Sequence, residues 1–186
     1  NFQGWRIAEI VEKCRRWGLP QPAVLQPCYH ALYRMAEVEM FPACRHYGLG
    51  IVSYSPLARG VLTGKYLSAA KPPADSRAGR GDSRFMETEF RAESLAIAQK
   101  LRRHAAKKGM SAAHFALNWV INNALVTSVL AGPRTFAQWQ DYLAALAHKF
   151  DAEDEALVDS LVPRGHNSTP GYTDPKYPVA GRVPRC

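Results

Sequence analysis

The chain of 186 residues lacks the segments that mark membrane and secreted proteins. No apolar run approaches the length needed to span a bilayer, and the first residues lack the basic and apolar regions of a signal peptide. We therefore expect a cytoplasmic protein without a membrane partner. A composition of 47% apolar and 22% charged residues is typical of one globular domain with a sizeable core.

Metal and disulfide spacings are also missing. The four cysteines, Cys14, Cys28, Cys44 and Cys186, include no Cys-x-x-Cys pair, and two of them fall in expected helices. The six histidines offer no His-Glu-x-x-His pair, and no Ser/His/Asp arrangement follows from spacing. We therefore predict no metal site and expect reduced, mostly buried thiols.

Positive charge predominates, with a formal net charge of +8. The basic run at 100–108 shares its helix with an apolar face, so its charges are expected to face solvent. The arginine-rich segment 77–84 has only Phe85 as an aromatic neighbour, which argues against nucleic-acid binding. Phosphorylated cofactors remain as the polyanions that this charge favours. The apolar face is made of Leu95, Ala98, Leu101 and Ala105.

Hydrophobic periodicity predicts strands that alternate with helices, an order typical of a parallel sheet covered by helices. The expected helices span residues 5–18, 37–47, 92–108, 111–123, 135–147 and 151–162. The expected strands span residues 23–26, 50–54 and 127–131. Residues 55–91 show little periodicity, and a loop of this length is expected to be functional.

The stretch 51–66 combines a strand with a loop of small residues, one proline and a lysine. In such a turn, backbone N–H groups and the Lys65 ammonium converge on an anion, and Tyr54 at the strand's end offers a flat face to a planar ring. We predict that this segment borders a cofactor.

Four motifs together resemble the C-terminal half of an aldo-keto reductase. They are Asn1-Phe2, similar to the end of a Ser-Asn-Phe motif; Gln26 closing the sixth barrel strand; Tyr54-Ser55-Pro56-Leu57 with Gly60, Leu62, Gly64 and Lys65 after the seventh; and Gly132-Pro133-Arg134-Thr135 with Gln138 after the eighth. The resemblance implies an α/β fold, a partial (β/α)₈ TIM barrel of strands six to eight over residues 1–162, and an irregular tail at 163–186 that borders the substrate pocket.

The resemblance also implies an oxidoreductase that reduces aldehydes or ketones to alcohols with NADP(H). In this family the cofactor is bound without a Gly-x-Gly-x-x-Gly motif, and none occurs here. Asn1 and Gln26 are then expected to hydrogen-bond the nicotinamide carboxamide, and Tyr54 to stack on its ring. The structural alternatives are a turn residue, a buried amide and a core aromatic, respectively.

The phosphates and the adenosine account for the other expected site residues. The pyrophosphate is expected on Ser55, Pro56, Leu57, Ala58, Arg59 and Lys65. Arg77 matches a family position near the adenosine. The start of the helix after the third strand is expected to favour the 2′-phosphate of NADPH, through Gly132, Arg134, Thr135 and Gln138. Asp141 is expected at the adenine amino group, although Tyr142 stands where relatives often carry asparagine.

No catalytic residue is predicted in this chain, because the family's proton-donating tyrosine and its lysine, aspartate and histidine partners belong to the N-terminal half. The chain is thus expected to be the cofactor-binding half of a reductase, an incomplete or truncated piece that is inactive alone. The alternative is a non-enzymatic NADP-binding regulatory or interaction module. The expected partner is a small carbonyl compound, and a homo-oligomer is allowed.

Overall fold

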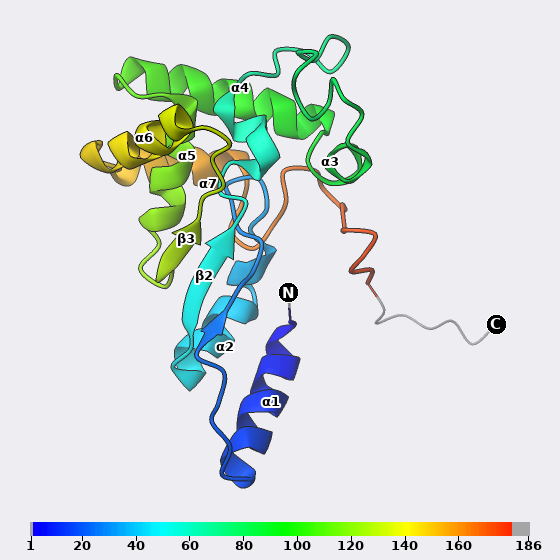
Figure 1. The fold of residues 1–186 in the computed structure, drawn as a ribbon, viewed down its shortest axis with the longest axis vertical. Helices are drawn as coiled ribbons and strands as arrows, with labels where there is room; N and C mark the ends of the chain where they lie inside the picture. Colours follow the sequence, from blue (N-terminus) through cyan, green and yellow to red (C-terminus); the bar gives the residue numbers. More distant parts are fainter. Residues whose placement is uncertain (1, 180–186) are drawn as a thin grey trace, which may run out of the picture.

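Three short parallel strands lie side by side in the computed structural model, which describes residues 2–179 (Figure 1). Their order is β1 (Val24–Leu25), β2 (Gly50–Tyr54) and β3 (Ser128–Leu130). Leu25 lies opposite Ile51, and Tyr54 lies opposite Leu130. Because the strands are parallel, their carboxyl ends meet at one edge, where a barrel places its ligands. The α/β fold with a parallel sheet is therefore confirmed, and it is consistent with part of a (β/α)₈ barrel.

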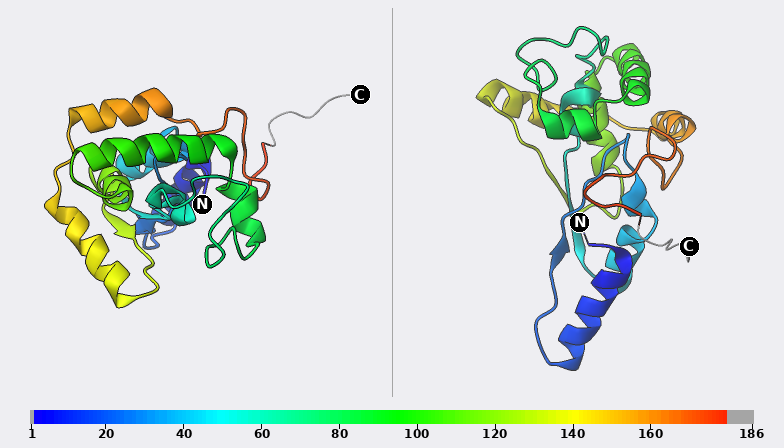
Figure 2. Two further views of the ribbon diagram at one scale, coloured as in Figure 1. Left: turned by 90° about the horizontal axis from the view of Figure 1, so that it is seen from above. Right: turned by 90° about the vertical axis from the view of Figure 1, so that its right-hand side faces the viewer.

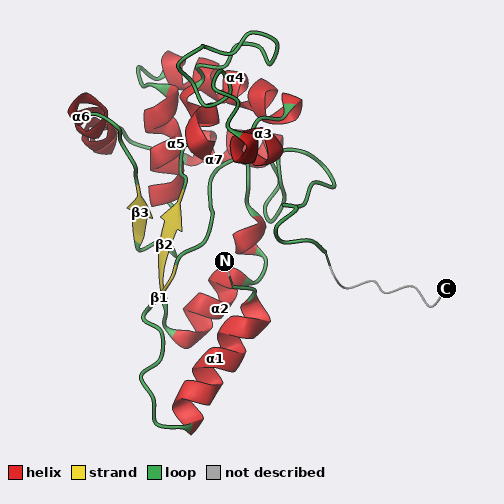
Figure 3. Ribbon diagram, turned by 45° about the vertical axis from the view of Figure 1, so that its right-hand side comes forward, coloured by secondary structure: helices red, strands yellow, loops and turns green. Residues whose placement is uncertain are grey.

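The helices form two groups along the sheet (Figure 3). At one end α1 packs against α2, and beyond the carboxyl ends of the strands α4 packs against α5. Seen from above, α4 extends across this second group with α5 end-on beside it (Figure 2). The helices are α1 (Gly4–Arg16), α2 (Met40–Tyr47), α3 (Ser83–Thr88), α4 (Ala92–Lys107), α5 (Ala112–Ile121), α6 (Phe136–Ala144) and α7 (Ala152–Leu161). Among residues 2–179, no helix is long and apolar enough to cross a membrane.

Most expected helices are confirmed to within a few residues, and capping hydrogen bonds fix where several of them begin. Ser111 accepts a hydrogen bond from the His114 N–H at 3.1 Å, and Asp151 and Asp154 form a complete capping box. Thr135 accepts from the Gln138 N–H at 3.2 Å, but the Gln138 side chain accepts from Arg134 instead of closing the box.

The expectation of an irregular segment at 55–91 is wrong in two places. The 3₁₀ segment η2 (Ala58–Thr63) follows β2, and α3 lies near the far end of the segment. Helix α3 begins because Asp82 accepts a hydrogen bond from the Phe85 N–H at 2.9 Å while the Phe85 ring is buried. Such short elements carry too few apolar positions to show a period.

The core confirms the predicted apolar face of α4. The α4 face described above is buried, and so are Phe115, Trp119 and Val120 of α5. The expectation of mostly buried thiols holds only for Cys44, because Cys14 and Cys28 are half-buried. Cys186 lies outside the described residues.

Arg34 connects several elements from inside the core. Its side chain is 2% exposed and stacks on Trp119, with 5.3 Å between guanidinium carbon and ring centre. It donates to Glu37 Oε1 at 2.9 Å, to Asp159 Oδ1 at 2.7 Å and to the Val162 carbonyl at 2.8 Å. A short 3₁₀ segment, η1 (Met35–Glu37), is thereby tied to α5 and α7.

We expect Arg34→Met to lower the free energy of unfolding by about 3 kcal/mol, because the change leaves partly buried carboxylates without their cation. Arg164→Ala is the matched control, since Arg164 pairs with the same Asp159 at 2.9 Å but is 71% exposed. Its loss should cost less than about 1 kcal/mol. Urea denaturation followed by circular dichroism measures both, and equal losses would contradict the role of Arg34.

Candidate functional site

The turn after β2 holds three residues other than glycine in the left-handed region. Ser55 has φ 60°, Ala58 has φ 47° and Arg59 has φ 52°. Each such residue costs on the order of 1–3 kcal/mol, and strain of this kind clusters at ligand sites. The turn is therefore a candidate binding element, as the sequence predicts for this segment.

Burial and hydrogen bonds hold the strained turn in place. Val61 and Leu62 are buried where η2 packs against α4 and α5. Thr63 Oγ1 donates to the Gly60 carbonyl at 2.8 Å. From α4, Gln99 Nε2 donates to the carbonyl oxygens of Gly64 at 3.0 Å and of Tyr66 at 2.9 Å. The backbone is thus shaped in advance, so a ligand does not have to order it.

A cavity of about 470 Å³, called here the basic cavity, opens at the carboxyl ends of β2 and β3. Ten of the fifteen predicted site residues line it, namely Tyr54, Ser55, Pro56, Leu57, Arg59, Lys65, Arg77, Gly132, Arg134 and Gln138, whereas Ala58 is buried in the turn and does not line the cavity. The wall also contains Gly60, Thr63, Asp75, Ser76, Arg80, Leu130, Ala131 and Tyr142.

Five cationic side chains line this cavity, whereas Asp75 is its one acidic lining residue among residues 2–179. The Nε of Arg59 is buried and has no hydrogen-bond partner in the described part of the chain. A buried donor left unpaired is costly, so Arg59 is poised for an acceptor on a ligand. The five are Arg59, Lys65, Arg77, Arg80 and Arg134.

Two of these arginines are held by neighbours in the loop. Arg77 Nη1 donates to Asp82 Oδ2 at 2.8 Å, and Arg80 Nη1 donates to the Asp75 carbonyl at 2.5 Å. Hydrogen bonds from the Phe85 N–H and from Arg77 lower the pKa of Asp82 below its ordinary value. Asp82 therefore stays ionised at neutral pH and keeps Arg77 close to the cavity.

The other predicted residues lie elsewhere. Gln26 is exposed and lines neither cavity, so it is not the buried amide considered as its alternative role. Thr135 caps α6 instead of facing the cavity. The Asp141 carboxylate lies 2.9 Å from His114 Nε2 and forms a hydrogen bond or an ion pair with it, according to the protonation of the ring. The neighbouring Tyr142, and not Asp141, lines the cavity. Asn1 lies outside the described residues.

A second cavity of about 470 Å³ adjoins the basic cavity, because Tyr54 and Arg59 line both. Side chains from the tail line part of it, and Arg84 pairs with Asp174 in its wall. Its wall contains Gln3, Gly4, Cys28, Tyr33, Met35, Ala36, Val38, Glu39, Met40, Arg84, Thr88, Glu89, Asn167, Tyr172, Thr173, Asp174, Tyr177, Pro178 and Val179.

Sequence reasoning missed several of these residues. Arg80 follows Arg77 in the arginine-rich segment, so its composition was a usable signal. For Tyr142 the sequence indicates only a departure from the family pattern and predicts no contact with a ligand. Cys28, His30 and Glu89 come together in space although Glu89 is far from the other two in sequence, and no spacing rule signals such a group.

Comparisons with known proteins identify the family of the chain. The model of the Aldo/keto reductase family matches residues 2–163. An uncharacterized oxidoreductase, YrpG, of Bacillus subtilis is 33% identical over 173 residues, 91% of this chain and 49% of the relative. L-glyceraldehyde 3-phosphate reductase of Escherichia coli (strain K12) is 32% identical over 173 residues, 89% of this chain and 48% of the relative.

A human relative, aflatoxin B1 aldehyde reductase member 2, is 33% identical over 159 residues, 78% of this chain and 44% of the relative. The chain spans about half the length of these relatives. The family model covers most of the chain, including both motifs that line the basic cavity. The chain belongs to the aldo/keto reductase family.

Proposed function

We propose that the basic cavity binds NADPH and that the chain is the cofactor-binding part of a reductase of aldehydes or ketones. One observation carries the proposal: five cationic side chains line a cavity at the carboxyl ends of parallel strands, next to a turn whose backbone already has a strained conformation without a ligand. Phosphate groups are the ligands that such a concentration of arginine and lysine fits.

The cavity offers a place for each part of the dinucleotide. Tyr54, at the boundary of the two cavities, would stack on the nicotinamide ring. The pyrophosphate would meet the turn after β2, with the free Nε of Arg59 and the Lys65 ammonium. Arg134, just before α6, would bind the 2′-phosphate, and Tyr142 rather than Asp141 would contact the adenine.

The second cavity would receive the carbonyl substrate, since it meets the cofactor cavity at Tyr54. NADPH, when bound, supplies the hydride that reduces the carbonyl carbon. The proton for the carbonyl oxygen would come from the family's tyrosine in an N-terminal half, because no position of this chain matches that residue. Aldehydes are the favoured class, since relatives at over 30% identity are named as aldehyde-type reductases.

The experiment is a titration of the purified chain with NADPH, followed by an assay of NADPH oxidation with a panel of aldehydes. The chain alone should bind NADPH without turnover, and the protein that joins it to an N-terminal half with the catalytic tyrosine should reduce the aldehydes. Absence of NADPH binding would overturn the proposal. Binding without turnover in the joined protein would favour a non-enzymatic module.

We expect Arg134→Ala to weaken NADPH binding by about 10- to 100-fold, because a charge-assisted contact to phosphate contributes about 1.5–3 kcal/mol. Binding of NADH, which lacks the 2′-phosphate, should change little. Arg103→Ala is the control, since Arg103 is exposed on α4 and lines neither cavity. Equal losses for NADPH and NADH would place Arg134 away from the 2′-phosphate.

At Arg59 we expect stability and binding to change in opposite directions. Arg59→Gly removes a strained φ of 52° and should raise the free energy of unfolding by about 0.5–1 kcal/mol while weakening NADPH binding. Arg59→Ala keeps the strain and should lose binding without gaining stability. Urea denaturation and fluorescence titration separate the two effects, and unchanged NADPH affinity in both variants would exclude Arg59 from the site.

A further inference from the structure

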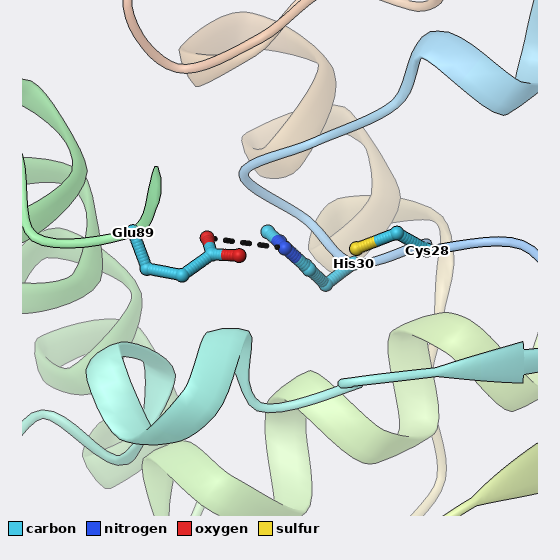
Figure 4. A group of neighbouring side chains, drawn as sticks. All are labelled: Cys28, His30 and Glu89. Atoms are coloured by element: carbon cyan, nitrogen blue, oxygen red, sulfur yellow. Dashed lines mark ion pairs between the residues drawn. The ribbon is translucent and has the colours of Figure 1, made fainter. Parts of the chain in front are cut away.

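Cys28, His30 and Glu89 form a group of ligand-type side chains in and beside the wall of the second cavity (Figure 4). One ligand atom from each residue lies within 4.8 Å of the others. An ion at the centre would therefore be at most about 2.8 Å from each ligand atom. Side-chain movements of less than about 1 Å would shorten these distances to the roughly 2.0–2.3 Å that is typical of zinc–ligand bonds. The proposed cofactor function uses none of these three side chains.

The histidine is held in place by its surroundings. His30 is fully buried, and its backbone exchanges hydrogen bonds with that of Tyr33. Its Nε2 is buried, makes no hydrogen bond of good geometry, and lies 3.3 Å from Glu89 Oε2, at ion-pair distance. Burial of this pair is costly unless a positive charge lies between the nitrogen and the carboxylate, which is 6% exposed, and either a ring proton or a bound cation supplies that charge.

We propose that Cys28, His30 and Glu89 bind a divalent ion of the zinc class. Thiolate, imidazole and carboxylate are the three ligand types that zinc takes from proteins. Cys28 and Glu89 line the second cavity, so a fourth coordination position would open into that cavity, the pattern of zinc sites that accept an exogenous ligand.

Binding has a cost at the second ring nitrogen. The Leu32 N–H lies 3.3 Å from His30 Nδ1 and donates to it, which leaves the ring proton on Nε2. An ion at Nε2 binds the tautomer that carries the single ring proton on Nδ1, so that proton moves from Nε2 to Nδ1 and the long hydrogen bond from Leu32 is given up. The hydrogen bond that is lost is long and therefore weak, and the coordinate bond is gained at the other ring nitrogen.

The test uses the purified chain, stripped of metal and titrated with Zn²⁺ and, separately, with Co²⁺. One equivalent should bind, and Co²⁺ should give the charge-transfer absorption of a thiolate ligand. Cys28→Ser should abolish that absorption and weaken zinc binding more than about 100-fold, since loss of an outer partner alone costs about 10- to 100-fold. Glu89→Gln should weaken zinc binding while keeping the absorption.

Cys14→Ser is the matched control, because Cys14 is a half-buried thiol on α1 outside the group. It should leave both signals unchanged, and circular dichroism confirms that each variant is folded. Absence of stoichiometric binding to the folded chain, or equal binding by Cys28→Ser and the unmodified chain, would overturn the proposal and leave His30 and Glu89 as an ion pair only.

Discussion

The site depends on the backbone of the turn that follows β2. Three side chains other than glycine occupy the left-handed region there, at a cost that the turn cannot recover by itself. The compensation comes from η2, whose buried residues pack against α4 and α5, and from the amide of Gln99. The helices beyond the strand ends therefore hold the turn that forms one side of the basic cavity and carries Arg59 and Lys65.

A second constraint joins the distant parts of the chain. The Arg34 guanidinium pairs with Glu37, nearby in the sequence, and with Asp159 of α7. It also stacks on the Trp119 ring of α5. The tail leaves α7 close by and returns over the second cavity, with the His166 carbonyl accepting from the Arg34 N–H at 2.9 Å. The Arg34 backbone thus holds the start of the tail at His166, and its guanidinium holds the Val162 carbonyl just before it.

The sequence predicts the regular elements well, because their signals are local. The cap at Ser111, the glycine after α2 and the apolar residues of β2 each act within a few residues. The fold class follows from the order of these elements. The turn after β2 is a different case: its motif predicts a binding segment, but the left-handed conformations of Ser55 and Ala58 depend on packing against helices far along the chain.

The same distinction separates the predicted site residues. Those that follow directly from a strand end, such as Tyr54, Arg59 and Gly132, come together in the basic cavity because the sheet brings all strand ends to one edge. Asp141 differs because its position within α6 is set by the helix, and His114 on the packed α5 draws its carboxylate away. One step along the helix is enough to replace an acidic contact by the Tyr142 ring.

Two cavities that share Tyr54 and Arg59 cannot vary independently. The Cys28 backbone forms a parallel bridge with that of Tyr54. The end of β2 therefore contacts the segment that leads to His30, and its last residue, Tyr54, lines both cavities. A shift of this strand end would move the shared wall and the Cys28 thiol together. The strained turn begins at the next residue, so the turn, the basic cavity and the Cys28 backbone all adjoin the end of β2.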